Sequence, residues 1–478
     1  ALTTDQVAKL TTDQIVALSS TQAPKLSAQQ IAALSTTQVS KLGVDNLKVL
    51  SNDAIEALSV SQAKTLSTTQ LAALTSSQFR RLTTGAIAAL ASDRIVNLTN
   101  DQVAAITTDQ AQALTTSQIK NLNGAKLEKL STSAVGSLSA SQIKAIDSAA
   151  IASLTTDQVK AIKVEALGGM SSEQIRQLVA TSQVKALTTA QINGLDSAQL
   201  KALDGTQMQN LSDAQISAIN ALQVKGVDSA DLNGLTTDQI RAFSTSAIGA
   251  MSAADQIAKL TSTQIGALTS SQAKALTVAQ AAAITSAQAG ALTSDEIGAM
   301  GNAQFASLAS GVVGKLTNEA VGAITTGQAK VLTTDQIKAL SSAQFVNLSA
   351  ANISVLDGTQ YAAISSTVIP NLTTDQVAAI STATLSGLNA SGQFAKLTST
   401  QIGALTSTQA KALTSDQLKE LNSAQVSQLA AGAVAVLTSA QVTGIDSADF
   451  AALSTDQLQA LSTQSVASLS SAQFSKLN

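Results

Sequence analysis

Two short acidic pairs are the residues whose types and spacing could support chemistry. Asp228 with Asp231 and Asp446 with Asp449 both occur in the sequence Asp-Ser-Ala-Asp. Two carboxylates three residues apart could ligate Ca²⁺ or act as a general acid and base. In a second interpretation, the first Asp caps a short helix and the second completes the same cap. We favour capping, because the sequence has neither an EF-hand loop nor a glycine-rich calcium nonapeptide.

The composition argues against most other catalytic mechanisms. The 478 residues include no His, Cys or Trp, one Tyr and seven Phe. Without imidazole or thiol groups, the chain lacks the usual general bases, nucleophiles and zinc ligands. We therefore predict that the protein is not an enzyme and has no cofactor and no metal.

The charged residues are few and dispersed. Only 12% of residues are charged and the formal net charge is -3. Nucleic-acid binding normally requires a basic patch, and a membrane span requires about 18 consecutive apolar residues. The sequence has neither feature, so we expect neither nucleic acid nor a membrane span among the interactions of this chain.

A repeat of eight residues runs through the whole sequence. Leu2, Leu10 and Leu18 begin a series of 59 units with the consensus Leu-[Ser/Thr]-x-x-Gln-[Val/Ile]-x-[Ala/Lys]. Each unit has a boundary position (the first Leu), a cap position after it, a glutamine position, and directly after that a second apolar position. Three units have nine residues, at 178–186, 251–259 and 388–396. The repeat predicts one continuous solenoid over residues 1–478.

The boundary and second apolar positions predict the core. No Asp, Glu, Lys or Arg occupies either position in any unit, and all Phe and Tyr residues fall there. Random placement would not exclude charge so strictly, so these side chains are expected inside the protein. The predicted core includes Leu2, Val7, Leu10, Ile15, Phe79, Phe243, Phe305, Phe345, Tyr361, Phe394, Phe450 and Phe474.

The cap position explains how the chain bends within each unit. Ser, Thr, Asp or Asn stands there in 52 of 59 units, and 40 units carry Gln at the glutamine position. Ser or Thr followed by Gln three residues later is a helix capping box, as in Thr3 with Gln6 and Thr11 with Gln14. A continuous helix would spread the boundary leucines around its surface, whereas a helix restarted in every unit keeps them on one side.

We therefore predict an all-α solenoid with one short capped helix per unit and two or three units per coil. Hydroxyls, amides and charges are expected to face solvent. A β-solenoid with corners at the Ser/Thr pairs is the alternative, because Thr, Val and Ile favour strands. Pro24 and Pro370 stand where a regular helix would need an amide, which predicts loose or 3₁₀ turns there.

The repeat tracts at 2–18, 332–340 and 397–421 resemble the octapeptide-repeat regions of very long secreted bacterial surface proteins of the adhesin-like kind. The resemblance covers the whole chain and brings no catalytic residues with it. It implies export by a secretion signal outside this sequence, and a location at the bacterial cell surface or in an extracellular filament. Because the first and last units look like interior ones, we also expect the full chain to be longer.

These observations lead to one functional hypothesis and one alternative. The first is a structural, non-catalytic protein that forms the shaft or protomer of an extracellular filament, surface fibre or surface layer, with copies of itself as partners, joined end to end or laterally. The alternative is a ligand-binding solenoid that recognises a glycan, a mineral, ice or a partner protein through its exposed positions. Those positions vary too much to form one uniform binding stripe.

Overall fold

The computed structural model describes residues 2–477. The chain forms two compact units, Ala1–Ala250 and Met251–Asn478. Within residues 2–477 each repeat forms one helical segment of three to six residues, and no strand occurs. The predicted all-α repeat fold is therefore confirmed, and the β-solenoid alternative is wrong. The prediction of one continuous solenoid over the whole chain stays a prediction.

The first unit consists of helical segments joined by two-residue or slightly longer bends. In chain order they are α1 (Thr4–Ala8), α2 (Thr12–Val16), η1 (Ala23–Lys25), α3 (Ala28–Ala33), α4 (Thr36–Ser40), α5 (Val44–Val49), α6 (Asn52–Glu56), α7 (Val60–Thr65), α8 (Thr68–Ala73), α9 (Ser76–Phe79), α10 (Thr84–Ala89), α11 (Ser92–Val96), α12 (Asn100–Ala104), α13 (Thr108–Ala113), α14 (Thr116–Lys120), α15 (Gly124–Leu127), α16 (Thr132–Gly136), α17 (Ala140–Ala145), η2 (Ser148–Ser153), α18 (Thr156–Ala161), α19 (Val164–Leu167), α20 (Ser172–Arg176), η3 (Ala180–Val184), α21 (Thr189–Gly194), α22 (Ser197–Lys201), α23 (Gly205–Gln209), α24 (Asp213–Ser217), η4 (Val224–Gly226), α25 (Ser229–Asn233), α26 (Thr237–Ala242) and α27 (Thr245–Ala250).

The second unit is built in the same way. Its segments are η5 (Ile257–Lys259), α28 (Ser262–Ile265), α29 (Ser270–Ala275), α30 (Val278–Ala282), α31 (Ser286–Ala289), α32 (Ser294–Ala299), α33 (Asn302–Ser307), α34 (Ser310–Val313), α35 (Asn318–Gly322), α36 (Thr326–Lys330), α37 (Thr334–Ala339), α38 (Ser342–Phe345), α39 (Ala350–Ser354), α40 (Gly358–Ala362), η6 (Ile369–Asn371), α41 (Thr374–Ala378), α42 (Thr382–Ser386), η7 (Phe394–Lys396), α43 (Ser399–Gly403), α44 (Ser407–Ala412), α45 (Ser415–Lys419), α46 (Ser423–Val426), α47 (Ala431–Val434), α48 (Ser439–Gly444), α49 (Ser447–Phe450), α50 (Thr455–Ala460), α51 (Thr463–Ala467) and α52 (Ser471–Phe474).

Each helix ends because the boundary and cap residues are extended. Leu34 has φ -63° and ψ 141°, and the next residue, Ser35, has φ -69° and ψ 160°. The cap hydroxyl then accepts the N–H three residues later, which starts the next helix. Two extended residues and one capped turn therefore make the corner that the sequence predicted in every eight-residue repeat.

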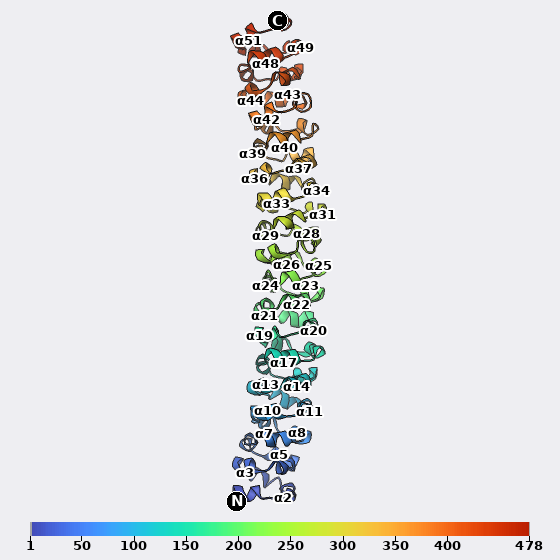
Figure 1. The fold of residues 1–478 in the computed structure, drawn as a ribbon, viewed down its shortest axis with the longest axis vertical. Helices are drawn as coiled ribbons and strands as arrows, with labels where there is room; N and C mark the ends of the chain where they lie inside the picture. Colours follow the sequence, from blue (N-terminus) through green and yellow to red (C-terminus); the bar gives the residue numbers. More distant parts are fainter. Residues whose placement is uncertain (1, 478) are drawn as a thin grey trace. The chain divides into compact units, whose positions relative to one another are not determined.

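Three repeats make one coil. In the first unit α7 packs on α10, and in the second unit α29 packs on α32 and α45 on α48, so that a helix meets the helix three repeats later. Figure 1 shows this stacking of short helices within each unit, from blue to green in the first and from green to red in the second. Helices this short are unstable alone, so contact with the coils on either side must stabilise them.

The core consists of the boundary and second apolar side chains, as expected for most of the named residues. Val7, Ile15, Phe79, Phe243, Phe305, Phe345, Tyr361, Phe394 and Phe450 are all buried. The prediction is wrong for Leu2 and Phe474, which are 51% and 62% exposed, and Leu10 is only half-buried. These three residues lie in the first and last described coils, which pack against a neighbouring coil on one side only.

The nine-residue repeats absorb their extra residue in a wider turn. The N–H groups of Val184, Ile257 and Phe394 each donate to the carbonyl five residues earlier, at 3.0 Å. A five-residue spacing is the π-type turn, which bulges one residue outward. The apolar residue of the repeat stays buried in all three cases.

Both prolines lie in 3₁₀ turns, as their position predicts. Pro24 belongs to η1 and Pro370 to η6, in each case within the first two residues of the turn. A proline there needs no amide hydrogen bond, so the solenoid accommodates it without a break. Among the helices of residues 2–477, none is long and apolar enough to cross a membrane.

Candidate functional site

The acidic pair Asp228 and Asp231 lies at the start of α25. Asp228 stands at the cap position, although its side chain makes no capping hydrogen bond, and its carboxylate lies 3.6 Å from the Lys201 ammonium. Asp231 occupies the glutamine position. Its pKa is raised by partial burial and, to a smaller extent, by the nearby charges of Asp228 and Asp204. Burial and like charges both disfavour the ionised carboxylate.

The second acidic pair belongs to α49. The Asp446 carboxylate accepts the Ala448 N–H at 3.0 Å, so this residue is a helix cap. Asp449 accepts a hydrogen bond from the Ser423 hydroxyl, one coil earlier, at 2.6 Å. The two pairs lie in different units of the chain. Within residues 2–477, no group of three or more acidic side chains has a geometry that could hold a metal ion.

The predicted capping boxes are present at the start of the chain. The Thr3 N–H donates to the Gln6 Oε1 at 2.8 Å, and the Gln6 N–H donates to the Thr3 Oγ1 at 3.3 Å. Thr11 and Gln14 make the same pair of bonds at the same two distances. These residues hold helix starts in place, in the manner that the repeat predicts.

The glutamine position has a second role that the sequence analysis missed. We expected its amides to face solvent, and this is wrong in the interior coils, where most are buried. Gln328 is the clearest case, with no exposed surface. Its Oε1 accepts the Thr325 N–H at 2.8 Å, while its Nε2 donates to the Ile297 and Met300 carbonyls at 2.6 and 2.8 Å.

The same arrangement recurs from coil to coil in both units. Gln62 donates to the Leu34 carbonyl, 28 residues earlier, at 2.6 Å, and Gln441 donates to the Leu413 carbonyl at 2.6 Å. We call this series of amide contacts the glutamine ladder. Each step satisfies a boundary carbonyl that would otherwise be buried without a donor. The ladder therefore joins each coil to the previous one by hydrogen bonds inside the structure.

Other donors replace Gln at some steps of the ladder. The shorter amide of Asn46 donates to the Leu18 carbonyl at 2.7 Å, and Asn352 donates to the Ile324 carbonyl at 2.7 Å. Lys126 places its ammonium 2.5 Å from the Leu98 carbonyl, and the hydroxyl of Ser465 lies 3.1 Å from the Leu437 carbonyl. The boundary carbonyl thus accepts amide, ammonium or hydroxyl groups.

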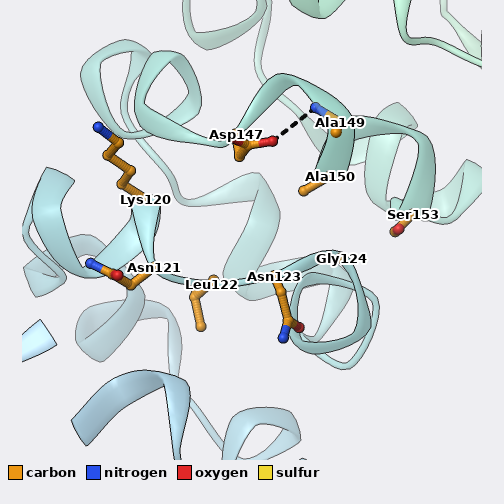
Figure 2. A pocket seen from close by; sticks show the side chains of 9 residues that line it. All are labelled: Lys120, Asn121, Leu122, Asn123, Gly124, Asp147, Ala149, Ala150 and Ser153. Atoms are coloured by element: carbon orange, nitrogen blue, oxygen red, sulfur yellow. Dashed lines mark hydrogen bonds between the residues drawn. The ribbon is translucent and has the colours of Figure 1, made fainter. Parts of the chain in front are cut away.

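Some repeats carry Ala at the glutamine position and leave a vacancy in the ladder. A groove lies at one of these, beside Ala150, with a volume of about 410 Å³. Figure 2 shows its lining, in which residues 120–124 of one coil face residues 147–153 of the next. The lining residues are Lys120, Asn121, Leu122, Asn123, Gly124, Asp147, Ala149, Ala150 and Ser153.

Glycine allows the two coils to approach closely at one edge of this groove. A Cβ atom on Gly124 would lie 2.1 Å from the Ser153 Oγ, so a larger residue there would push the coils apart. On the other edge, the ammonium of Lys120 points away from the groove (Figure 2). The groove is therefore a fixed gap between coils, lined by amide, carboxylate and backbone groups.

One buried polar atom lies in the core of the second unit. The hydroxyl of Tyr361 has no hydrogen-bond partner within the described chain, and burial raises the pKa of this phenol well above its usual range. Tyr361 takes a second apolar position, where Phe stands in several other repeats. The side chain is therefore a core-filling ring with one unpaired polar group.

Parts of the chain are similar to a known repeat family. A family model described as the ALTTAQ repeat matches four stretches of the chain, at residues 179–213, 224–262, 390–423 and 442–478. These stretches are similar to that repeat family and cover parts of both units. A search of curated proteins finds no match to the chain.

Proposed function

We propose that this protein is structural and non-catalytic, and that it forms the shaft or protomer of a bacterial extracellular filament, surface fibre or surface layer. The observation that carries the proposal is the glutamine ladder. It repeats the same donor and acceptor pairs through successive coils of both units, for instance from Gln118 to Leu90 and from Gln376 to Leu348. Regular bonding of this kind suits a scaffold that gains length by adding coils.

The side chains available for chemistry support the same proposal. The acidic pairs cap helices or contact neighbouring Lys and Ser groups, and the buried amides bond to backbone. A catalytic site instead needs a nucleophile or base whose partner orients it toward a substrate. A hydrolytic or transfer activity that is lost in the Asp228→Asn variant would contradict a non-catalytic role.

The shape of the purified chain in solution tests the structural role directly. We expect small-angle scattering and electron microscopy to show a particle several times longer than it is wide, because each coil adds length without adding width. A compact particle with similar dimensions in all directions would contradict the proposal. A shortened chain that lacks several whole repeats provides the control, since its length should fall in proportion to the repeats removed.

Self-association and location require separate measurements. We propose copies of the same chain as partners, end to end or laterally, and a place at the bacterial cell surface. Sedimentation velocity at rising concentration is expected to show growing assemblies, and a single monomeric species throughout would contradict self-association. Antibodies against the repeat should label intact cells, whereas labelling only after permeabilisation would contradict the surface location.

A further inference from the structure

The vacancy at Ala150 leaves two backbone groups without the partners that Gln supplies elsewhere. The Leu122 carbonyl stands 28 residues before Ala150, in the relation that Leu34 has to Gln62. The Asp147 N–H stands at the cap position, where the Gln Oε1 normally accepts. Within residues 2–477, neither group has a hydrogen-bond partner. The groove therefore offers one acceptor and one donor at fixed places.

The cap and the helix beside the groove differ from those of the next repeat. The Asp147 side chain accepts the Ala149 N–H at 3.0 Å, two residues on, and the segment that follows is the 3₁₀ helix η2. In Figure 2 the Asp147 side chain and Ala150 lie on the coil that faces Leu122 and Asn123. The open space between these coils is the groove of about 410 Å³.

A second vacancy shows the same relation. Ala134 also replaces Gln, and the carbonyl 28 residues earlier belongs to Ile106. A groove of about 340 Å³ lies there, lined by Ile106 and Thr107 of one coil and by Ser131 of the next. The vacancies at Ala134 and Ala150 thus each lie beside a groove between successive coils.

We propose that the groove at Ala150 binds a primary carboxamide, the group found on asparagine and glutamine side chains. The amide oxygen would accept the Asp147 N–H, and the amide nitrogen would donate to the Leu122 carbonyl. This reproduces the bonds of Gln158 in the following repeat, whose Oε1 accepts the Thr155 N–H and whose Nε2 donates to the Leu130 carbonyl, at 2.8 and 2.7 Å. Asn46 shows that the amide can arrive on a shorter side chain.

The pair of backbone groups discriminates among ligands. A carboxylate accepts from Asp147 but cannot donate to Leu122, and a dialkylated amide also lacks the donor. An ammonium donates to a boundary carbonyl, as Lys126 does, but cannot accept from the cap N–H. Only a group that both accepts and donates satisfies both backbone groups, so the primary amide is favoured over its acid and dimethyl analogues.

Binding of propionamide, which is the glutamine side chain without its backbone, tests the proposal. NMR titration of the full 478-residue chain should give saturable shifts at residues 122 and 147, with a dissociation constant in roughly the millimolar range for so small a ligand. Propionate and N,N-dimethylpropionamide should bind at least about tenfold more weakly, because each leaves the Leu122 carbonyl without a donor. Equal binding of all three compounds would overturn the proposal.

Filling the vacancy from within provides the matched control. The Ala150→Gln variant should lose propionamide binding at this groove and gain hydrogen-exchange protection at the Asp147 amide. The Ala433→Gln variant fills a glutamine position in the second unit and should leave binding at Leu122 unchanged. Undiminished binding by a folded Ala150→Gln variant would overturn the assignment to this groove.

The source of the amide is distinguished by two further ligands. Free glutamine and a short peptide with a central glutamine carry the same group, and a glutamate-containing peptide is the control. Tighter binding of the glutamine peptide supports a polypeptide partner, and equal binding of free glutamine supports a small-molecule ligand. Binding of the glutamate peptide as tight as that of the glutamine peptide would overturn the proposal.

Discussion

Two neighbouring segments of the first unit, α18 and η2, carry different residues at the glutamine position. Gln158 in α18 is buried, its Oε1 accepts the Thr155 N–H, and its Nε2 donates to the Leu127 and Leu130 carbonyls. Ala150 in η2 offers none of these bonds, and the segment is a 3₁₀ helix beside an open groove. The two repeats thus differ in helix type, in the closure between coils and in whether the boundary carbonyl and the cap N–H have hydrogen-bond partners.

The comparison shows when a buried polar group stabilises this fold. An amide inside the structure costs desolvation free energy, which is offset only when all its donors and acceptors have partners. The ladder Gln meets this condition, because one end bonds to its own helix cap and the other to the previous coil. A residue with only one of these functions should stabilise the coil less.

The largest effect is expected when a ladder step is removed. Gln158→Ala should lower the free energy of local opening around α18 by about 3 kcal/mol, because it leaves the Leu130 carbonyl and the Thr155 N–H without hydrogen-bond partners. Hydrogen exchange of the amides near Thr155 and Leu130 measures this effect. Gln29→Ala, at an exposed position, is the control and should change the same quantity by less than about 0.5 kcal/mol. Equal effects of both variants would show that the ladder contributes little.

One repeat carries Glu at the glutamine position, and replacing it with Gln should stabilise the protein. Glu296 is buried at the glutamine position, and its Oε2 accepts the Thr293 N–H at 2.7 Å. A carboxyl group donates a hydrogen bond only in its protonated form, whereas an amide both accepts from the cap and donates to the carbonyl 28 residues earlier, here that of Leu268, at every pH. Glu296→Gln should therefore raise the free energy of unfolding by about 1 to 2 kcal/mol, as measured by chemical denaturation. A loss of stability would show that the acid has a role that the amide cannot replace.

The repeat sequence could predict the corners, the capping boxes and most of the core. These features depend on residues at most eight positions apart, as in Thr3 with Gln6, and the pattern repeats too regularly to be misread. The ladder could not be predicted, since it depends on carbonyls 28 and 31 residues earlier, such as Leu34 and Ile31 for Gln62. That spacing follows from three repeats per coil, whereas the sequence allowed two or three.

The candidate site was predicted less well for the same reason. For Asp228 and Asp231 the sequence favoured a helix cap over a metal or acid–base pair. The structure places both at a helix start, but Asp228 makes no capping hydrogen bond and contacts Lys201 instead. The vacancy at Ala150 is visible in the sequence as a missing Gln. The groove could not be predicted from that missing Gln, because the sequence does not show that the Leu122 carbonyl lies opposite Ala150.

A smaller effect is expected for the unpaired hydroxyl in the core. Tyr361→Phe removes a buried polar atom that has no hydrogen-bond partner, and the ring remains in place. The free energy of unfolding should rise by about 1 kcal/mol, as seen in a higher denaturant midpoint. Phe345→Tyr is the reciprocal variant, since it introduces a hydroxyl at an equivalent buried position, and it should lower the midpoint. A destabilised Tyr361→Phe variant would indicate that the hydroxyl is satisfied by bound water.

The smallest effect concerns pH and Asp231, which lies at a glutamine position but is only partly buried. Its pKa lies above the ordinary value of 3.8 because burial, and then the charges of Asp228 and Asp204, disfavour the carboxylate. The folded state therefore binds its proton more tightly than the unfolded chain does, and stability should fall as the pH rises from that value through the raised pKa. Denaturation midpoints measured across this acidic range should show the fall.

Asp231→Asn should remove this contribution and supply an amide such as Asn46 has, so the variant should be slightly more stable than the parent at neutral pH. If the pH dependence of stability is unchanged in Asp231→Asn, other carboxylates cause it, and the charge of Asp231 at the glutamine position does not destabilise the folded state.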